Sequence, residues 1–315
     1  MRKTILFFLF LISASIESYS QLETNNQSKL PKVSNGSIQR ITNFKSNYVD
    51  SRNVDVWLPE GYTIDKKYQV LYMHDGQMLF DSTTTWNHQE WQVDEIATKL
   101  INENMVAPFI VVGIFNSGSK RHSDYFPQKP FEHLSKEEQE LIYKSNRSNN
   151  NSVFADKIHS DDYLKFIVEE LKPFIDSSYS TLKSKKHTFI AGSSMGGLIS
   201  MYAICEYPTV FGGAACISTH WPGTFAVDNN PIPDSFLDYL KMNLPSPRKH
   251  KLYFDHGTKT LDAMYGAFQT KADQIIIEGG YTSAHFMTKV FEGDDHSEKS
   301  WAKHLDIPLT FLLKK

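Results

Sequence analysis

Residues 192–196 read Gly-Ser-Ser-Met-Gly, and this Gly-x-Ser-x-Gly pattern lies between an apolar stretch at 188–191 and a run of helical composition at 198–207. On a sharp turn from a strand into a helix, a serine side chain is exposed at the end of the strand, where its hydroxyl can attack a carbonyl carbon. The glycines on both sides leave the space that such a turn requires, and Gly197 adds to it. The pattern therefore predicts Ser194 as a nucleophile.

A serine hydroxyl near neutral pH needs a base that takes its proton, and the base needs an acidic group that orients it. His296, between the last predicted strand and the last predicted helix, is the predicted base. Asp262, near the start of a predicted helix at 261–278, is the predicted acid, and Asp255, at the end of the preceding strand, remains the alternative. Both predicted residues follow Ser194 in the chain. The order along the chain is therefore nucleophile, acid, histidine, which is the usual order in proteins with this type of serine turn.

Attack on an ester places a negative charge on the carbonyl oxygen, which backbone N–H groups near the serine can stabilise. The N–H of Met195, directly after the serine, is one predicted donor, and the N–H of Gly76 or Gln77, after a predicted strand at 68–73, is the other. Aromatic and cationic side chains near these segments are candidates for contact with a substrate. The predicted substrate-binding residues are His220, Trp221, Arg121 and Tyr125.

Predicted strands alternate with predicted helices along most of the chain, which is typical of a doubly wound, mostly parallel α/β sheet. We predict one domain over 36–315, with antiparallel strands near its start, within 37–58. The pattern loosens at about 116–159, and we interpret this region as a loop-rich insertion that covers the active site, with a plain surface excursion as the alternative.

Two of the predicted helices contain a proline, which removes a backbone donor and clashes with the preceding turn of a helix. The helix at 161–177 is expected to be interrupted late, at Pro173. The last helix, at 300–313, is expected to be interrupted at Pro308.

The chain has 315 residues and a formal net charge of -3, and it has no basic blocks of the kind that bind nucleic acid. Its cysteine and histidine spacing is not typical of a metal site, so neither a metal nor a cofactor is expected. Cys205 and Cys216 are interpreted as buried small hydrophobic residues, with a disulfide between them as the alternative. The oligomeric state stays open.

Residues 1–20 have the pattern of a secretory signal peptide, with a short basic start, an apolar stretch and small residues before Gln21. The apolar stretch is too short for a membrane anchor, so no membrane span is expected after cleavage. We therefore expect an exported protein, periplasmic or secreted. Residues 21–35 are polar and are predicted to form a flexible leader.

Taken together, these motifs resemble the "Putative esterase" family of α/β-hydrolases over nearly all of the chain after the signal peptide. The similarity lies in the segments VLYMHDGQMLFD and FIVEELKPFID, in VGI followed by Arg121 and an Asp-Tyr pair, in the serine turn, and in His296 with Trp301. The family includes esterase D, feruloyl and acetyl-xylan esterases, siderophore esterases and mycolyltransferases. The resemblance implies an α/β-hydrolase fold.

The sequence thus predicts an exported serine hydrolase that cleaves carboxylic esters through an acyl-enzyme. Acyl esters on carbohydrate, or on a similar small polar molecule, are the leading substrate class, and a siderophore ester is the alternative. An acyltransferase of the same fold would need an acyl-enzyme that excludes water and admits an alcohol. A non-catalytic binding protein is a further alternative, against which the complete set of Ser194, Asp262 and His296 argues.

Overall fold

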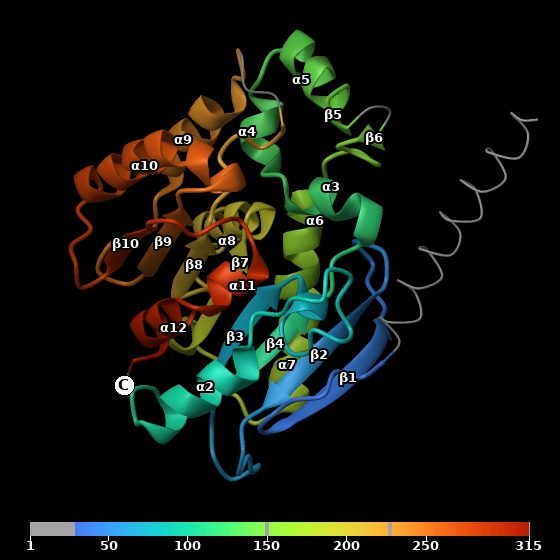
Figure 1. Ribbon diagram of the computed structural model, residues 1–315, viewed down its shortest axis with the longest axis vertical. Helices are drawn as coiled ribbons and strands as arrows, with labels where there is room; N and C mark the ends of the chain where they lie inside the picture. The colour runs from blue at the N-terminus through green and yellow to red at the C-terminus, as the bar shows by residue number, and fades with distance from the viewer. Residues whose placement is uncertain (1–28, 149–150, 226–228, 315) are drawn as a thin grey trace, which may run out of the picture.

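The computed structural model describes residues 29–148, 151–225 and 229–314. The predicted signal peptide lies outside these ranges. Eight strands form one sheet in the order β1-β2-β4-β3-β7-β8-β9-β10 (Figure 1). The strands are β1 (Ser37–Phe44), β2 (Arg52–Leu58), β3 (Gln69–His74), β4 (Phe109–Ile114), β7 (Thr188–Ser193), β8 (Gly213–Ile217), β9 (Lys251–Gly257) and β10 (Phe286–Phe291).

The strand directions agree with the sequence prediction. Strand β2 pairs antiparallel with both β1 and β4. The other neighbouring strands of this sheet, in the order β4-β3-β7-β8-β9-β10, all pair parallel. The α/β-hydrolase fold, mostly parallel with antiparallel N-terminal strands, is therefore confirmed. The carboxyl ends of the parallel strands all lie along one edge of the sheet, where loops can bring distant residues together.

Helices cover both faces of the sheet, because alternate residues of each buried strand point to opposite faces. In β3, Val70 and Tyr72 belong to one hydrophobic cluster, and Leu71 and Met73 belong to the other. The first face is covered by α6 (Ser160–Lys165), a π-helical segment η3 (Phe166–Leu171), α7 (Lys172–Ser178), α8 (Met195–Glu206), α9 (Ile232–Asn243) and α10 (Gly266–Glu278). The second face is covered by α2 (Val93–Asn102) and α12 (Asp306–Leu313), which lie side by side, with α11 (Glu298–Ala302) beside them (Figure 1).

Both expected helix interruptions occur before the proline rather than at it. The chain from α6 to α7 is helical throughout, and its irregular part is the π-helical segment, while Pro173 is the second residue of α7. A π turn opens the helix at the point where the proline ring would clash with the preceding carbonyl. Pro308 lies in the first turn of α12, where a backbone N–H has no intrahelical acceptor in any case.

The predicted insertion contains more regular structure than its composition indicated. It holds η2 (Gly118–Lys120), α3 (Arg121–Tyr125), α4 (Gln128–Glu132), α5 (Lys136–Tyr143) and two short antiparallel strands, β5 (Asn146–Ser148) and β6 (Asn151–Ser152). Helix α5 begins with a capping box between Ser135 and Glu138. Such a cap satisfies backbone donors in a short helix that has little apolar surface to bury.

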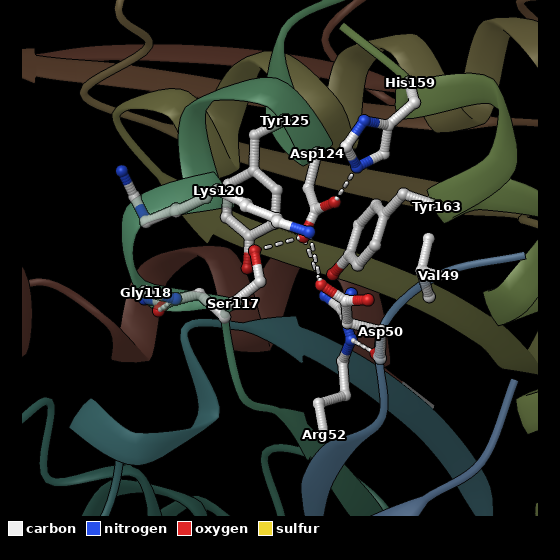
Figure 2. A network of polar contacts seen from close by, with 12 residues as sticks. Val49, Asp50, Arg52, Ser117, Gly118, Lys120, Asp124, Tyr125, His159 and Tyr163 are labelled. Carbon is white, nitrogen blue, oxygen red and sulfur yellow. Dashed lines mark hydrogen bonds and ion pairs between the residues drawn. The ribbon is translucent and has the colours of Figure 1, made fainter. Parts of the chain in front are cut away.

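A buried ionic network fixes the first part of the insertion to the sheet (Figure 2). Asp124 accepts hydrogen bonds from Arg52 Nη1 at 2.9 Å and from Ser117 Oγ at 2.6 Å, and it contacts His159 Nε2 at 2.7 Å. Arg52 begins β2, so these contacts join the two ends of the insertion to the N-terminal part of the sheet. Burial raises the pKa of Asp124, but the hydrogen bond with His159 and the charge of Arg52 outweigh burial and leave it below its ordinary value.

The described end of the predicted leader is held by hydrogen bonds. The Lys32 N–H donates to Asp81 Oδ2 at 2.8 Å, and the Asn35 carbonyl accepts from Trp57 Nε1 at 2.9 Å. This part of the leader is therefore anchored, because backbone groups that lie against the domain find partners there.

Both cysteines are free and buried, as the sequence interpretation favoured. Their burial raises the pKa of each thiol, so they behave as small hydrophobic residues. Among the helices of the described ranges, none has the length and apolar character needed to cross a membrane.

Candidate active site

Ser194 lies between the end of β7 and the start of α8, at the carboxyl edge of the sheet. Its backbone has φ 59° and ψ -120°, a conformation that costs free energy for any residue with a side chain. The end of β8 and the loop after it hold the serine there, since the Ser194 N–H donates to the Ile217 carbonyl at 2.9 Å and the His220 N–H donates to the Ser194 carbonyl at 3.2 Å. The predicted turn is confirmed, and it places the half-buried serine at the end of the strand.

The glycines of the turn differ in how much they are needed. A Cβ on Gly192 would come within 2.9 Å of the Gly196 carbonyl carbon, and a Cβ on Gly197 within 2.9 Å of Thr219 Oγ1. At Gly196 the nearest atoms would be 3.4 Å and 3.5 Å away, at ordinary contact distance. The tight positions are therefore Gly192 and Gly197, whereas the sequence argument assigned the demand to Gly192 and Gly196.

His296 and Asp262 form a close pair although 34 residues separate them. His296 Nδ1 lies 2.5 Å from Asp262 Oδ1, and the Asp262 side chain has 0% of its surface exposed. The second carboxylate oxygen of Asp262 accepts from the Gly257 N–H and from Ser218 Oγ, both at 2.6 Å. Because both carboxylate oxygens are held, Asp262 fixes the orientation of the imidazole.

Asp255, the alternative acid, has other partners. Its carboxylate accepts from the Tyr253 hydroxyl at 2.8 Å and from the Ser218 N–H at 3.0 Å. Burial raises the pKa of Asp255 to about 7, which disfavours a permanent negative charge there. The geometry thus pairs His296 with Asp262 and gives Asp255 a place in the support of the Ser218 loop.

Trp301 supports this pair from the side. Its Nε1 donates to Ser218 Oγ at 2.9 Å, and its ring stands nearly perpendicular to the His296 ring, with the centroids 5.0 Å apart. Ser218 itself has a positive φ of 42°, which aims its short side chain at Asp262. The loop after β8, the loop after β9 and helix α11 therefore meet at one carboxylate.

Tyr265 is a site residue that the sequence reasoning missed. Its hydroxyl is hydrogen-bonded with the Ser194 side chain and lies 2.7 Å from His220 Nδ1. Burial, followed by the charge of Asp262, raises the pKa of Tyr265, so the phenol is neutral. Burial lowers the pKa of His220 well below its ordinary value, so it is neutral too. The one available signal was the position of Tyr265 three residues after the predicted acid, in the same short helix η5 (Thr260–Met264) and its cap.

The predicted oxyanion donors lie on two elements. Met195 is the first residue of α8, where backbone N–H groups have no intrahelical acceptor. Gly76 begins the short 3-10 helix η1 (Gly76–Met78), in which the Met78 N–H already donates to the Asp75 carbonyl. A Cβ on Gly76 would lie 2.4 Å from the Gly113 carbonyl carbon, so only glycine allows this loop to approach β4 so closely. The Gln77 side chain accepts from the Asn116 N–H at 3.2 Å.

Asp75 connects this loop to Arg121. Arg121 donates from Nε and Nη2 to the two Asp75 oxygens at 2.6 Å and 2.8 Å, and Asn116 Nδ2 donates at 2.7 Å. Burial raises the pKa of Asp75, but the charge and hydrogen bonds of Arg121 outweigh burial and hold it below its ordinary value. Arg121 therefore positions the loop, which limits its availability for the substrate contact that the sequence predicted.

Two of the predicted substrate-binding aromatics belong to the core. Trp221 is fully buried, its Nε1 donates to Gln269 Oε1 at 3.0 Å, and its ring stacks on Phe254. Tyr125 is also fully buried, and its hydroxyl accepts from the Asp75 N–H at 3.4 Å. Apolar contact stabilises these large rings more than exposure in a cleft would, and both rings are packed in the core rather than exposed in a cleft.

His220, by contrast, contacts the hydroxyl of Tyr265, which in turn contacts Ser194. The His220 ring packs against Phe225, with the ring centroids 5.7 Å apart. The Arg147 guanidinium lies over the same Phe225 ring, 5.5 Å from its centroid. Burial and the nearby charge of Arg121 lower the pKa of Arg147. An aromatic ring and a cation without a described carboxylate partner thus lie beyond His220, and the sequence reasoning did not name the cation, Arg147, as a site residue.

Two known proteins are similar to this chain in sequence. The Bacillus subtilis protein YbbA is 23% identical over 270 residues, which cover 84% of this chain and 94% of YbbA. A second protein of that organism, YjcH, is 22% identical over 179 residues, and the match covers 60% of YjcH, less than two thirds of its length.

Two solved structures are similar in fold. The ferulic acid esterase of Anaeromyces mucronatus, in complex with ferulic acid, has a TM-score of 0.60 and 19% identity over 92% of this chain and 96% of that chain. The enterobactin esterase of Shigella flexneri, in the presence of 2,3-dihydroxy-N-benzoyl-glycine, has a TM-score of 0.62 and 17% identity over 90% of this chain and 60% of that chain.

A family model also matches most of the chain. The model described as "Putative esterase" covers residues 46–309, from the strand β2 region to helix α12. This range contains the serine turn, the Asp262–His296 pair and the Asp75 loop. The chain therefore belongs to this esterase family.

Proposed function

We propose that the protein is a serine hydrolase that cleaves carboxylic esters through an acyl-enzyme. The observation that carries the proposal is the 2.5 Å contact between His296 and a fully buried Asp262 at the sheet edge that also presents Ser194 on a strained turn. A buried, doubly hydrogen-bonded carboxylate has little purpose in a plain surface loop. It serves to orient an imidazole and to stabilise its protonated form during catalysis.

In the proposed reaction, Ser194 Oγ attacks the ester carbonyl carbon while its proton passes to Nε2 of His296. The Met195 N–H and the N–H of Gly76 or Gln77 donate to the oxyanion, a contribution of about 3–4 kcal/mol for one such donor. The protonated His296 then gives its proton to the leaving alcohol as the C–O bond breaks. Water attacks the acyl-enzyme by the same route, and the carboxylic acid is released.

Tyr265 belongs to this proposal as a positioning residue. A neutral His220 can accept the Tyr265 proton at Nδ1, which leaves the tyrosine oxygen free to accept from the Ser194 hydroxyl. In the free protein this arrangement holds the serine side chain in the site. A small rotation about the Cα–Cβ bond of Ser194 would then direct its proton to His296.

For the substrate we propose acyl esters carried by carbohydrate, with an aromatic acyl group such as ferulate. Membership of the esterase family supports this class, and the Anaeromyces mucronatus structure holds ferulic acid. The Phe225 ring beside His220 offers a surface for an aromatic acyl group.

A siderophore ester is the second candidate, and Arg147 is the observation that favours it. Its guanidinium lies over Phe225 near the site, where it could bind an anionic group next to an aromatic ring. The Shigella flexneri relative was solved with an aromatic ligand that carries a carboxylate.

The first experiment is hydrolysis of p-nitrophenyl acetate and butyrate by the wild type and by Ser194→Ala. Ser193→Ala is the matched control, because it removes the neighbouring hydroxyl at the variable position of the motif. Turnover that disappears only in Ser194→Ala would support the proposal. Equal slow turnover by all three proteins would overturn it and favour the binding-protein alternative.

A second experiment separates the substrate classes. We would compare kcat/KM for methyl ferulate, acetylated xylan and a linear siderophore ester, and repeat each assay with added glycerol as an acyl acceptor. Preference for the siderophore ester that is lost in Arg147→Gln would favour the second candidate. Glycerol ester as the main product would replace hydrolysis with acyl transfer.

We also propose that residues 1–20 direct export and are then removed. The basic start, the apolar stretch and the small residues before Gln21 support this proposal. N-terminal sequencing of protein recovered outside the cytoplasm should begin at Gln21. Recovery of the intact N-terminus at Met1 in that fraction would contradict cleavage.

A further inference from the structure

The sheet carries a second concave feature at its amino edge, opposite the serine. An open cavity of about 610 Å³ is lined by the starts of strands β3, β7 and β9, by the segments that precede β4, β8 and β10, and by the end of α12. Leu312 and Lys314, near the C-terminus, line this cavity, while Ser194 and His296 follow the carboxyl ends of β7 and β10, at the opposite edge of the sheet. The volume is in the range of small-molecule sites, about 300–1,000 Å³.

The lining of this cavity, which we term the amino-edge cavity, is strongly basic. Seven of its seventeen described lining residues are lysine or arginine, three are histidine, and none is aspartate or glutamate. The whole chain, in contrast, has a formal net charge of -3. The cations therefore gather here against the overall sign of the protein, and a cavity lined by one sign of charge focuses its field on an opposite charge.

Two of the cations are held in place by backbone carbonyls. Lys185 Nζ donates to the Pro208 carbonyl at 3.2 Å, and Lys251 Nζ donates to the Phe311 and Leu312 carbonyls at 2.8 Å and 3.1 Å. Carbonyls neutralise no charge, so both ammonium groups remain available to an anion. Burial, followed by the charge of Lys314, lowers the pKa of Lys251, which an anion in the cavity would reverse.

The remaining five cations are exposed. Within the described ranges, none of the seven forms an ion pair with an aspartate or glutamate. Arg248 and Lys249 are adjacent in the chain, and Lys186 lies beside the half-buried Lys185. Elsewhere the protein pairs its cations readily, as with Arg52 and Arg121. Unpaired like charges around one cavity repel one another, and a bound anion removes that repulsion.

The floor of the cavity is apolar. Phe189 and Leu312 are 3% and 1% exposed, and Pro108 and Leu182 continue this surface. An inorganic anion would leave such a floor in contact with water. A ligand with an organic body would cover it and place its charged groups against the surrounding lysines.

We propose that the amino-edge cavity binds a small organic polyanion, a molecule with two or more phosphate, sulfate or carboxylate groups on an organic body. The shared chemistry is several negative charges held by lysine and arginine around an apolar floor. A nucleotide and a sulfated or uronate oligosaccharide both have this chemistry. The site is distinct from the proposed catalytic residues and does not depend on their role.

The test is calorimetric titration of the full-length protein with ATP in the absence of metal, with pyrophosphate and with a sulfated disaccharide, at low salt and at about 0.5 M salt. We expect saturable binding of ATP or of the sulfated disaccharide, tighter than that of pyrophosphate and weaker at high salt. Tighter binding of ATP would indicate a nucleotide as the ligand, and tighter binding of the disaccharide would indicate an anionic oligosaccharide. The absence of saturable binding by all three probes would overturn the proposal.

Two double variants localise the binding. Arg248→Glu with Lys249→Glu should weaken the preferred probe by roughly tenfold or more, with hydrolysis of p-nitrophenyl acetate unchanged. Lys45→Glu with Lys157→Glu makes the same change of charge on exposed residues away from the cavity, and it should leave binding within about twofold. An equal loss of affinity in both double variants would mean that only the net charge of the protein matters, and it would overturn the proposal. So would binding only to phosphatidylcholine–phosphatidylglycerol vesicles, which would indicate a membrane surface instead.

Discussion

The two edges of the sheet treat charge in opposite ways. At the carboxyl edge, Asp262 is paired with His296, Asp75 with Arg121, and Asp124 with Arg52 and His159, and each of these carboxylates has further hydrogen bonds. At the amino edge, seven cations surround a cavity without a described carboxylate. These three carboxylates are therefore paired before any ligand arrives, whereas the cations of the amino edge gain a counter-charge only from a ligand or from ions in the solvent.

This difference indicates two different uses of charge. A group that must act at one atom of a substrate needs a fixed orientation, and paired carboxylates provide it at the cost of burying charge. A surface that attracts an anion needs net positive charge rather than a fixed orientation of its side chains, and carboxylate partners would weaken that attraction. Both arrangements occur on one rigid sheet, so substitutions at one edge can be compared with substitutions at the other.

The largest expected effect is on catalysis at the carboxyl edge. Asp262→Asn should lower kcat for p-nitrophenyl acetate by roughly 10³–10⁴-fold, because an amide cannot stabilise a protonated His296. Asp255→Asn is the matched control, with the same chemical change in a carboxylate that does not contact His296, and it should stay within about tenfold. Similar losses in both variants, measured on folded protein, would remove the distinction between the two aspartates.

The next largest effect is on stability, at the buried pair in Figure 2. Arg52→Met leaves Asp124 buried with one fewer counter-charge, and we expect a loss of about 3–5 kcal/mol in the free energy of unfolding in urea. Lys120→Met removes a cation from the exposed pair with Asp50 in the same network, and no measurable change is expected. A small effect of Arg52→Met would mean that the carboxyl edge depends less on paired charge than its geometry indicates.

The sequence predicted the parts of this molecule that short segments determine. Ser194 has its own five-residue pattern, and the strands and helices follow from local apolar periodicity. His296 and Asp262 could be selected because chain order and position after a strand restrict the candidates to a few residues. The parallel sheet then brought the selected residues to one edge.

The remaining parts depend on contacts that no short segment contains. Ser218 and Tyr265 come from the loops after β8 and β9, and each looks ordinary in its own segment. Trp301 was part of the sequence resemblance, but its hydrogen bond to Ser218 depends on the packing of α11 against the loop after β8. Trp221 and Tyr125 were expected at the substrate because aromatic residues near the right loops cannot be assigned to a cleft or to the core without tertiary contacts. The cations of the amino-edge cavity come from several separate segments of the chain, so no single segment indicates the cavity.

A smaller effect concerns the pH dependence of stability at His159. The hydrogen bond with Asp124 raises the pKa of His159, so this group stabilises the fold fully below its unfolded value, about pH 6.5, and the contribution is lost as pH rises through the raised pKa. The free energy of unfolding of wild type should exceed that of His159→Gln by roughly 0.5–1 kcal/mol in the acidic range, and the gap should narrow toward alkaline pH. His133→Gln, on an exposed histidine without such a partner in the described structure, is the control. A gap that widens with pH would contradict the paired, protonated His159.

The smallest expected effect lies at the amino edge and has the opposite sign. Lys314→Gln removes a like charge near Lys251, so it should raise the thermal midpoint at low salt, by about 1–2 °C if the repulsion amounts to several tenths of a kcal/mol. The gain should vanish at about 0.5 M salt, where exposed charges are screened. Lys45→Gln, on an exposed lysine that does not line the cavity, should show neither effect. If removal of a cation stabilises this edge while removal of Arg52 destabilises the other, the same type of charge is a structural necessity at one end of the strands and a cost at the other. A surface that retains such a cost is expected where a ligand supplies the missing negative charge.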